Sequence, residues 1–465
     1  MANVSGDSHR PIREFRDPVH GFVKLTDAEV DIVNSKPFQR LRDIRQLAMG
    51  HMVYPGANHT RFEHSLGCVH VSTQILDLLV ERAKVGGTTF EEAFHANPET
   101  AQRGKRILRL ASLLHDVGHP PFSHSGENLL AQDMNHEKMT AFIIRETEIA
   151  EIINEHYAAE GISAEDVIVV ATSPALSDDP SKNTAFNLFL NQILTGELGS
   201  DRIDYLLRDA VHSGQPSGRF DYLKLMNAMA LVLQPEGEGE AVQLGLDEGG
   251  WLVAEQMVVA RYLMYIALYF HKTKRIYERH LTDFMKDWLS KGKLPKTVKK
   301  YLDLSDTTVL NAIVDSGRKP ASNGHQHAKR FVGRNHLRLA KEVILADNCR
   351  EDDKGRRFPD GERFDKLGNH VRMLYGDTLT DIPDHTATKM FATDSKILVR
   401  IDGKPRYLDE VSEVVRGMSS KIWRGRIYCE KGHEDQVKAA CEEFLSQNSS
   451  VQENSDADET SKAGQ

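Results

Sequence analysis

The sequence predicts a mainly α-helical protein with a smaller α+β region toward its C-terminal end. Two patterns support this fold class: apolar residues recur at helical spacing over most of residues 25–290, and they alternate in short runs beyond residue 395. The chain has 465 residues, of which 40% are hydrophobic, so it can bury at least one large core. We expect a first domain at residues 1–290, an α+β region at 291–445 and a disordered acidic tail at 446–465.

Five stretches of the first region carry the helical pattern. Apolar residues recur at three- and four-residue spacings in AEVDIVNS, HVSTQILDLLVERA, RILRLASLLHD, TAFIIRETEIAEIINEHY and EQMVVARYLMYIALYFHKTKRIYERHLTDFM. We expect a helix in each, and one long helix in the last. The segment AVQLGLDEGGWLVA at 241–254 interrupts this pattern, because two alternating runs flank DEGG and predict a β-hairpin.

The last third of the chain changes character. KILVRI at 396–401, the turn DGKP, RYLDEVSEVV and IWRGRIYCE predict strand, turn, helix and strand in that order. The final residues are polar, acidic and almost free of large apolar groups, so they cannot bury enough surface to offset the entropy of ordering.

Composition limits the classes of function. A formal net charge of −9 argues against coating of nucleic acid through overall charge, although a local basic site stays open. The N-terminal residues include no apolar export segment and the chain has no long uninterrupted apolar run, so we expect a cytoplasmic protein without membrane contact. The four cysteines show no CxxC spacing, which predicts free thiols.

A histidine–aspartate pair ends one of the predicted helices. In LASLLHDVGHPP, apolar residues lead into His115 and Asp116 before Gly118 and the prolines stop the helix. Imidazole and carboxylate together suit a divalent first-row metal, although an isolated pair is more often a core histidine beside a terminal polar residue. His64 in RFEHSLG alone fits an ordinary helix residue, and Asp201 fits a first helical turn.

Taken together, the motifs RFEHSLG, LLHDVGHPPFSH and DRIDYLLRD resemble those of the HD-domain deoxynucleoside triphosphate triphosphohydrolases. This family contains the bacterial dGTPases and the vertebrate SAM-and-HD-domain dNTPase. The resemblance begins at RDPVHGFVKLT and continues to about residue 280. It implies an HD-domain helical core for the first region.

The resemblance also implies roles for particular residues. Four would hold one divalent transition metal (Mn, Fe or Zn), with Mg accompanying the triphosphate: His64, His115, Asp116 and Asp201. Catalytic positions around the α-phosphate would be His119, His124, Glu127 and His136. Substrate contacts would be Gln46, Arg61, Arg202, Tyr205, Asp209, Arg261 and Tyr269. On residue chemistry alone, Tyr269 fits a core position and Arg261 a solvated surface charge.

The implied activity is hydrolysis of dNTPs to deoxynucleoside and tripolyphosphate, by attack of metal-activated water on the α-phosphate. Two alternatives stay open: an HD phosphohydrolase acting on another nucleotide or a nucleic acid end, and a catalytically silent nucleotide-binding protein. Overall charge gives no indication of a nucleic acid partner. The family resemblance further implies a homo-oligomer, either a dimer or a tetramer.

Regulation by an activating nucleotide also stays open. Gln39, Arg40 and Arg42 match the allosteric region of the family, but a basic helical stretch that pairs with neighbouring acids explains them equally well. Asn34 stands where the vertebrate protein has the aspartate that reads guanine. An amide cannot accept two guanine hydrogen bonds as a carboxylate does, so activation by GTP is doubtful.

Overall fold

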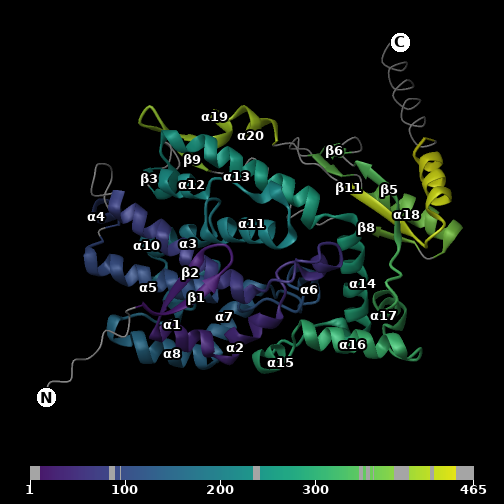
Figure 1. Cartoon of the computed structure of the whole chain (residues 1–465), viewed down its shortest axis with the longest axis horizontal. Coiled ribbons are helices and arrows are strands. Elements are labelled where there is room, and N and C mark those ends of the chain that lie inside the picture. Colours follow the sequence, from purple (N-terminus) through teal and green to yellow (C-terminus); the bar gives the residue numbers. More distant parts are fainter. Residues whose placement is uncertain are drawn as a thin grey trace, which may run out of the picture.

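The structure is a computed structural model that describes residues 11–82, 90–94, 96–233, 241–344, 349–351, 357–359, 361–376, 378–381, 397–418 and 424–446. Helices predominate and the sheets are small, which confirms the mainly α fold class (Figure 1). The tail predicted at 446–465 lies outside the described residues, apart from Ser446.

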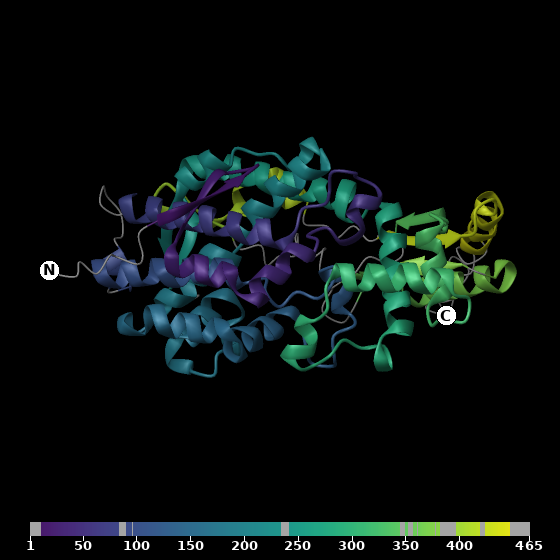
Figure 2. The same ribbon diagram turned by 60° about the horizontal axis from the view of Figure 1, so that its bottom comes forward.

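The centre of the molecule is a helical core in which α3 (Arg61–Arg82) packs against α5 (Pro98–Leu114) and α11 (Ser200–Ser213) (Figures 1 and 2). α5 begins where Asn97 accepts a hydrogen bond from Thr100 N and Pro98 fits the first turn. Its apolar face is fully buried. The surrounding helices are α1 (Asp27–Asn34), α2 (Lys36–Gln39), α4 (Phe90–Phe94), α6 (His124–Glu127), α7 (His136–Glu146), α8 (Glu148–Tyr157), α9 (Ala164–Ala171), α10 (Ala185–Thr195), α12 (Tyr222–Ala228) and α13 (Trp251–Met264).

Two of the predicted helices are interrupted. The stretch TAFIIRETEIAEIINEHY breaks between α7 and α8 at Thr147, whose side chain caps α8. The predicted long helix divides into α13, a π-helical turn at Tyr265–Tyr269 and α14 (Lys272–Trp288). The prediction of one continuous helix was wrong because its apolar periodicity continues past His271, which leaves the helical path and caps α14.

Strands from both halves of the chain share one sheet. β1 (Pro11–Asp17) and β2 (Gly21–Thr26) form an N-terminal hairpin, and a second sheet has the order β10 (Lys404–Tyr407), β9 (Leu398–Ile401), β4 (Val242–Leu246), β3 (Met229–Leu233). β9 runs parallel to β4, with Leu398 opposite Gly245. The hairpin predicted at 241–254 was wrong: β4 pairs with β3, and the second apolar run begins α13 after a helical turn at Glu248–Gly250.

The remaining elements follow α14. They are α15 (Val298–Leu302), α16 (Asp306–Arg318) and α17 (His325–Val332), then a sheet of β5 (Arg338–Ile344), β11 (Arg424–Cys429) and β8 (Leu379–Asp381) with α18 (Gly361–Tyr375), a hairpin of β6 (Cys349–Glu351) and β7 (Arg357–Pro359), and the short helices α19 (Leu408–Val411) and α20 (Glu413–Gly417). The predicted strands at 396–401 and in IWRGRIYCE correspond to β9 and β11, which lie in different sheets.

The main hydrophobic core crosses residue 290. Tyr301, Val309, Val399 and Leu408 are buried in the same apolar cluster as the central helices, while Phe364 and Ile427 belong to a separate cluster on the three-stranded sheet. Residues from both sides of position 290 thus pack in one core. The domain boundary near residue 290 stays a prediction.

Within the described part of the chain, one helical stretch, Glu248–Tyr269, is long and apolar enough by length and composition to cross a membrane. Core helices of proteins in water meet the same criterion. Val253, Met257 and Met264 of this stretch are buried in the main core, whereas Leu252 and Leu263 are exposed.

Candidate functional site

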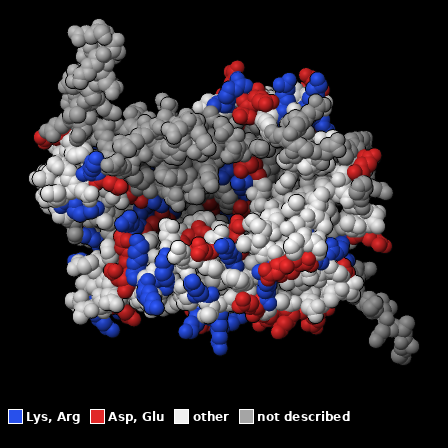
Figure 3. Space-filling view, turned by 180° about the vertical axis from the view of Figure 1, so that it is seen from behind, with Lys and Arg blue, Asp and Glu red and all other residues white. Residues whose placement is uncertain are grey.

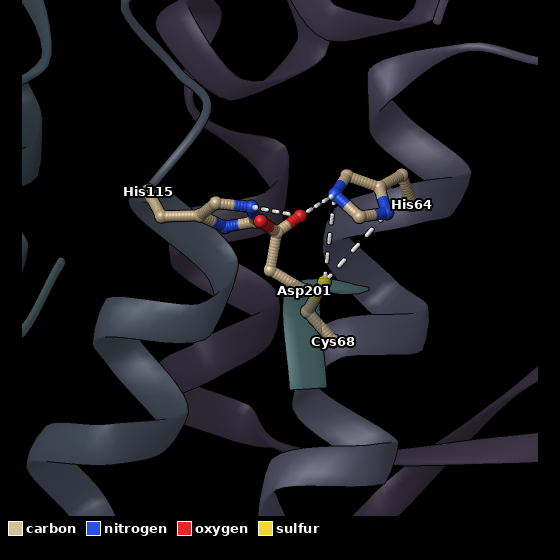
Figure 4. Close-up of side chains that lie close together, drawn as sticks. All are labelled: His64, Cys68, His115 and Asp201. Carbon is tan, nitrogen blue, oxygen red and sulfur yellow. Dashed lines mark hydrogen bonds and ion pairs between the residues drawn. The ribbon is translucent and has the colours of Figure 1, made fainter. Parts of the chain in front are cut away.

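Four side chains from three helices converge at the centre of the helical core. His64 comes from the first turn of α3, His115 and Asp116 from the end of α5, and Asp201 from the first turn of α11. His64 Nε2 lies 3.0 Å from Asp201 Oδ1 and 3.5 Å from Asp116 Oδ2, and His115 Nε2 lies 3.6 Å from Asp116 Oδ2 and 3.9 Å from Asp201 Oδ1. Figure 4 shows His64 and His115 on either side of Asp201. The structure thus brings together all four residues predicted as metal ligands.

The potential ligand atoms of this group fit a divalent metal. His115 Nδ1 donates to the Ser112 carbonyl at 2.9 Å, which leaves its buried Nε2 without a hydrogen-bond partner. His64 Nδ1 lies 2.7 Å from Asp204 Oδ2, so its Nε2 also faces the carboxylates. Two imidazole nitrogens and two carboxylates form a ligand set that first-row transition metals accept.

The electrostatics of the group favour a positive charge at its centre. Burial alone would lower the pKa of His64, but hydrogen bonds to the Asp201 and Asp204 carboxylates raise it well above its usual value. Burial alone would raise the pKa of Asp116, but the Arg61 guanidinium and two nearby histidines hold it well below its usual range. A metal ion would satisfy the same carboxylates as the proton on His64.

A buried ionic network holds His64 from behind. Asp204 is fully buried, and its carboxylate accepts hydrogen bonds from His64 Nδ1 and His20 Nε2 at 2.7 Å each and from Arg208 Nε and Nη2 at 2.9 Å each. Arg208 Nη1 also donates to Asp17 Oδ2 at 2.8 Å. The network needs Gly67, because a Cβ there would lie 1.8 Å from Asp204 Oδ1. Asp204 was not predicted, although it lies in the same DRIDYLLRD motif as Asp201.

Cys68 is a second residue that sequence reasoning missed. It lies one helical turn after His64, with its Sγ 3.6 Å from His64 Nε2, and it completes a cluster of four potential ligands with His64, His115 and Asp201 (Figure 4). Burial raises the pKa of the Cys68 thiol to about 12, so in the metal-free protein the sulfur is neutral. Its i+4 spacing from His64 could have shown the contact.

A second histidine group lies beside the first. Ligand atoms of His119, His124 and His136 lie within 4.8 Å of one another, and the Glu127 carboxylate bonds to both His124 and His136. Burial and Arg61 hold the pKa of His119 well below its usual value, whereas Glu127 raises that of His136 against the effect of burial. The group therefore combines an imidazole that resists protonation with one whose protonated form the Glu127 carboxylate stabilises. Asp116 Oδ1 lies 3.1 Å from His119 Nδ1 and joins the two groups.

One cavity of about 990 Å³ is lined by three residues of the first group (His115, Asp116 and Asp201) and by all three histidines of the second, while His64 is fully buried. Its wall also includes Gln46, Arg61, Tyr205, Asp209 and Tyr269, all of them predicted substrate contacts. On the back face of the molecule, acidic and basic side chains gather around a central hollow (Figure 3). The cavity therefore has a metal-ligand end and an aromatic, hydrogen-bonding end.

Asp209 is held from two sides at the aromatic end. The Tyr269 hydroxyl donates to Asp209 Oδ2 at 2.7 Å, and His59 Nε2 donates to Oδ1 at 2.7 Å. The Tyr205 and Tyr269 rings meet edge to face, with centroids 6.4 Å apart. His59 was not predicted, although it lies only two residues before Arg61, the first residue of the motif RFEHSLG.

Arg202 and Arg261 share a carboxylate in this structure. Arg202 Nη2 lies 2.9 Å from Glu197 Oε1, and Arg261 Nη1 lies 3.1 Å from Glu197 Oε2. Neither arginine is among the described residues that line the cavity. The Arg261 side chain is only 13% exposed, so it is not a solvated surface charge.

The three residues predicted as allosteric lie in different environments. Arg42 is exposed, its guanidinium lies 3.5 Å from the centre of the Phe62 ring, and its Nε donates to Gln39. Arg40 is buried and points inward, where its Nη1 donates to the His119 carbonyl at 3.0 Å. Of the three, Arg40 thus contacts the backbone of His119, one of the residues that line the cavity.

Comparison with known proteins places this architecture. The family model for the HD domain matches residues 61–173, and the model for the HD associated region matches residues 220–456. The crystal structure of a hypothetical protein from Aquifex aeolicus matches 92% of this chain and 99% of its own, with a TM-score of 0.70 and 30% identity.

Curated relatives include both uncharacterized proteins and named enzymes. The uncharacterized protein MJ1154 of Methanocaldococcus jannaschii is 30% identical over 302 residues, which are 65% of this chain and 54% of that protein. The deoxynucleoside triphosphate triphosphohydrolase SAMHD1 homolog of Dictyostelium discoideum is 25% identical over 382 residues, 78% of this chain and 66% of that protein. The match spans about half the length of the first of these relatives. Because the HD associated region model alone covers just over half of the chain, the protein belongs to the HD phosphohydrolase family whose members carry that region.

Proposed function

We propose that the protein hydrolyses deoxynucleoside triphosphates to a deoxynucleoside and tripolyphosphate. The observation that carries the proposal is that one cavity, lined by the metal-ligand residues His115, Asp116 and Asp201, also reaches the Asp209–Tyr269 pair. The metal-ligand residues suit binding of a phosphate group, and the Asp209–Tyr269 pair suits binding of a sugar. Relatives named as deoxynucleoside triphosphate triphosphohydrolases, at 25–27% identity, support the same assignment.

The phosphate end would bind and orient the α-phosphate. His64, His115, Asp116 and Asp201 would hold a divalent metal, which when bound would supply positive charge for polarising a phosphate oxygen and for acidifying water. Arg61 is fixed by bonds to Asp116 and Ser123 and would place its remaining N–H groups toward phosphate oxygens.

Proton transfer would fall to the histidine–glutamate group. Glu127 Oε2 accepts from His124 Nδ1 at 2.8 Å, which leaves His124 Nε2 free to give a proton to the departing sugar oxygen. Glu127 Oε1, bonded to His136, would take the proton that the attacking water loses. The pKa of Glu127, which burial alone would raise, is lowered by its histidine partners, so the carboxylate is ionised; the same shift makes it a weaker base than a free glutamate.

The sugar end would select the substrate. Asp209 would accept a hydrogen bond from the 3′-hydroxyl, and the Tyr269 ring would pack against the face of the sugar. The rest of the triphosphate would need Arg202 and Arg261, which must first exchange their shared Glu197 for phosphate oxygens.

The test is incubation of the purified protein with each dNTP and each NTP, with Mn²⁺ or Mg²⁺, followed by phosphorus NMR. Tripolyphosphate should appear with dNTPs. The His115→Ala variant should lose both turnover and bound metal while its circular dichroism stays helical, whereas His433→Ala, at an exposed position of the C-terminal region, should match the wild type. Release of inorganic phosphate from another nucleotide, or no turnover at all, would favour the two alternatives instead. Light scattering of the same sample tests the predicted homo-oligomer.

A further inference from the structure

The turn between His119 and His124 has an unusual backbone. Phe122 and Ser123 both have positive φ angles, 58° and 53°, although neither is glycine. A bulky residue in this region is strained, and consecutive strained residues persist only where surrounding contacts hold them. This turn is the segment of chain that joins His119 to His124.

A carboxylate from a distant helix holds the strained turn. Asp306, in the first turn of α16, accepts a hydrogen bond from Phe122 N at 2.7 Å through Oδ1 and one from Arg45 N at 3.0 Å through Oδ2. Its side chain is 1% exposed. The Arg45 carbonyl in turn accepts from Ser123 Oγ at 2.8 Å, and Ser123 Oγ accepts from Arg61 Nε at 2.9 Å. Asp306 therefore joins the strained turn to the segment that leads into α3.

We infer that Asp306 is a positioning residue for the candidate active site, acting through the Phe122–Ser123 turn. The inference rests on the proposed function for its catalytic consequence. Burial raises the pKa of Asp306 to about 7, although both backbone N–H groups and Arg45 favour the ionised form. A carboxyl group that is costly to bury thus stands where two loops of the site meet.

Neighbouring contacts show that this junction is specific. Asp43 accepts from Ser305 Oγ at 2.5 Å and from Thr307 Oγ1 at 2.7 Å, on either side of Asp306. Asp43 therefore ties the same two elements together, but none of its bonds reaches the turn at Phe122. A variant at Asp43 loosens the junction without removing the bond to the turn, which makes it a matched control.

The experiment compares Asp306→Asn with Asp43→Asn and with Asp315→Asn, which changes an exposed residue of α16. At position 306 an amide keeps the shape but turns one acceptor into a donor that faces a backbone N–H. Hydrogen exchange followed by mass spectrometry should show residues 119–127 exchanging about tenfold faster in Asp306→Asn. In Asp43→Asn the increase should be confined to residues 40–45 and the start of α16, and Asp315→Asn should match the wild type.

Kinetics give the second readout. In Asp306→Asn, kcat should fall about 10- to 100-fold, while KM for the dNTP and the bound metal per chain stay within about twofold. Asp43→Asn should lose about as much thermal stability as Asp306→Asn but keep the kcat of the wild type. Equal exchange and equal kcat losses in both variants, or unchanged exchange at 119–127 in Asp306→Asn, would overturn the inference. If the wild type hydrolyses no dNTP, the proposed function fails, but the exchange comparison still decides the role of Asp306.

Discussion

Replacing Asp204 by asparagine should weaken metal binding and destabilise the fold at the same time. The fully buried carboxylate accepts four hydrogen bonds, from His64, His20 and twice from Arg208. An amide turns one oxygen into a donor that faces these donors, and it removes one charge of the buried pair with Arg208. Breaking a buried ion pair costs about 3–5 kcal/mol of the free energy of unfolding. Loss of the partner that orients a metal-binding histidine lowers metal affinity about 10- to 100-fold.

Urea unfolding of the metal-free protein and chelator competition for Mn²⁺ measure these two effects separately. Asp17→Asn is the matched control, because Asp17 pairs with the same Arg208 at 2.8 Å but does not touch His64. It should lower the stability and keep the metal affinity within about twofold of wild type. The reasoning is refuted if Asp204→Asn binds Mn²⁺ as tightly as the wild type, or if both variants lose the same affinity.

Three further predictions concern sugar selection, acid stability and helix packing. A buried unpaired 2′-hydroxyl costs about 1–3 kcal/mol, so kcat/KM should favour dATP over ATP at least about tenfold, and Tyr269→Ala should shrink this ratio more than it changes metal content. Burial beside an arginine lowers the pKa of His280 to about 3. In the unfolded chain this histidine has a pKa of about 6.5 and takes up a proton as the pH falls from about 7 to 5, whereas in the folded protein it stays neutral. This difference should lower the free energy of unfolding by about 2 kcal/mol over that pH range. His280→Gln should remove that part of the acid sensitivity in urea unfolding at the two pH values, and an unchanged pH dependence would contradict the assignment. Gly67→Ala puts a Cβ 1.8 Å from Asp204 Oδ1 and should lower the melting temperature sharply, whereas Gly249→Ala meets no atom within 4 Å and should not.

The sequence could predict what depends on local pattern. Helical periodicity predicted α5, which leads into His115, and most of α3, and the resemblance of three motifs to a known family implied the four residues that the structure brings together. The same local reasoning failed at His271, because apolar spacing says nothing about a break that tertiary contacts stabilise. Tyr428 of β11, for example, donates from its hydroxyl to the Lys272 carbonyl at 2.9 Å, next to that break.

Long-range partners could not be predicted. The Asp204–His20 and Asp306–Phe122 bonds each join residues 184 positions apart. Neither local propensity nor motif spacing carries that information, since each depends on how separate helices pack. The burial of Arg40 could not be predicted for the same reason: whether a side chain on a short helical turn is exposed depends on which distant segments pack over it.

The parallel pairing of β9 with β4 has a consequence for synthesis of the chain. Leu398 follows Leu246 by 152 residues. At the usual rate of about 5–20 residues per second, a ribosome needs roughly 8–30 s to make the missing neighbour. During that interval β4 is an edge strand with unpaired backbone groups, which can pair with another nascent chain. A fragment ending near residue 290 would keep this edge open permanently and would also lack the core residues Tyr301 and Val309, so it should aggregate during expression even though it contains every proposed metal ligand.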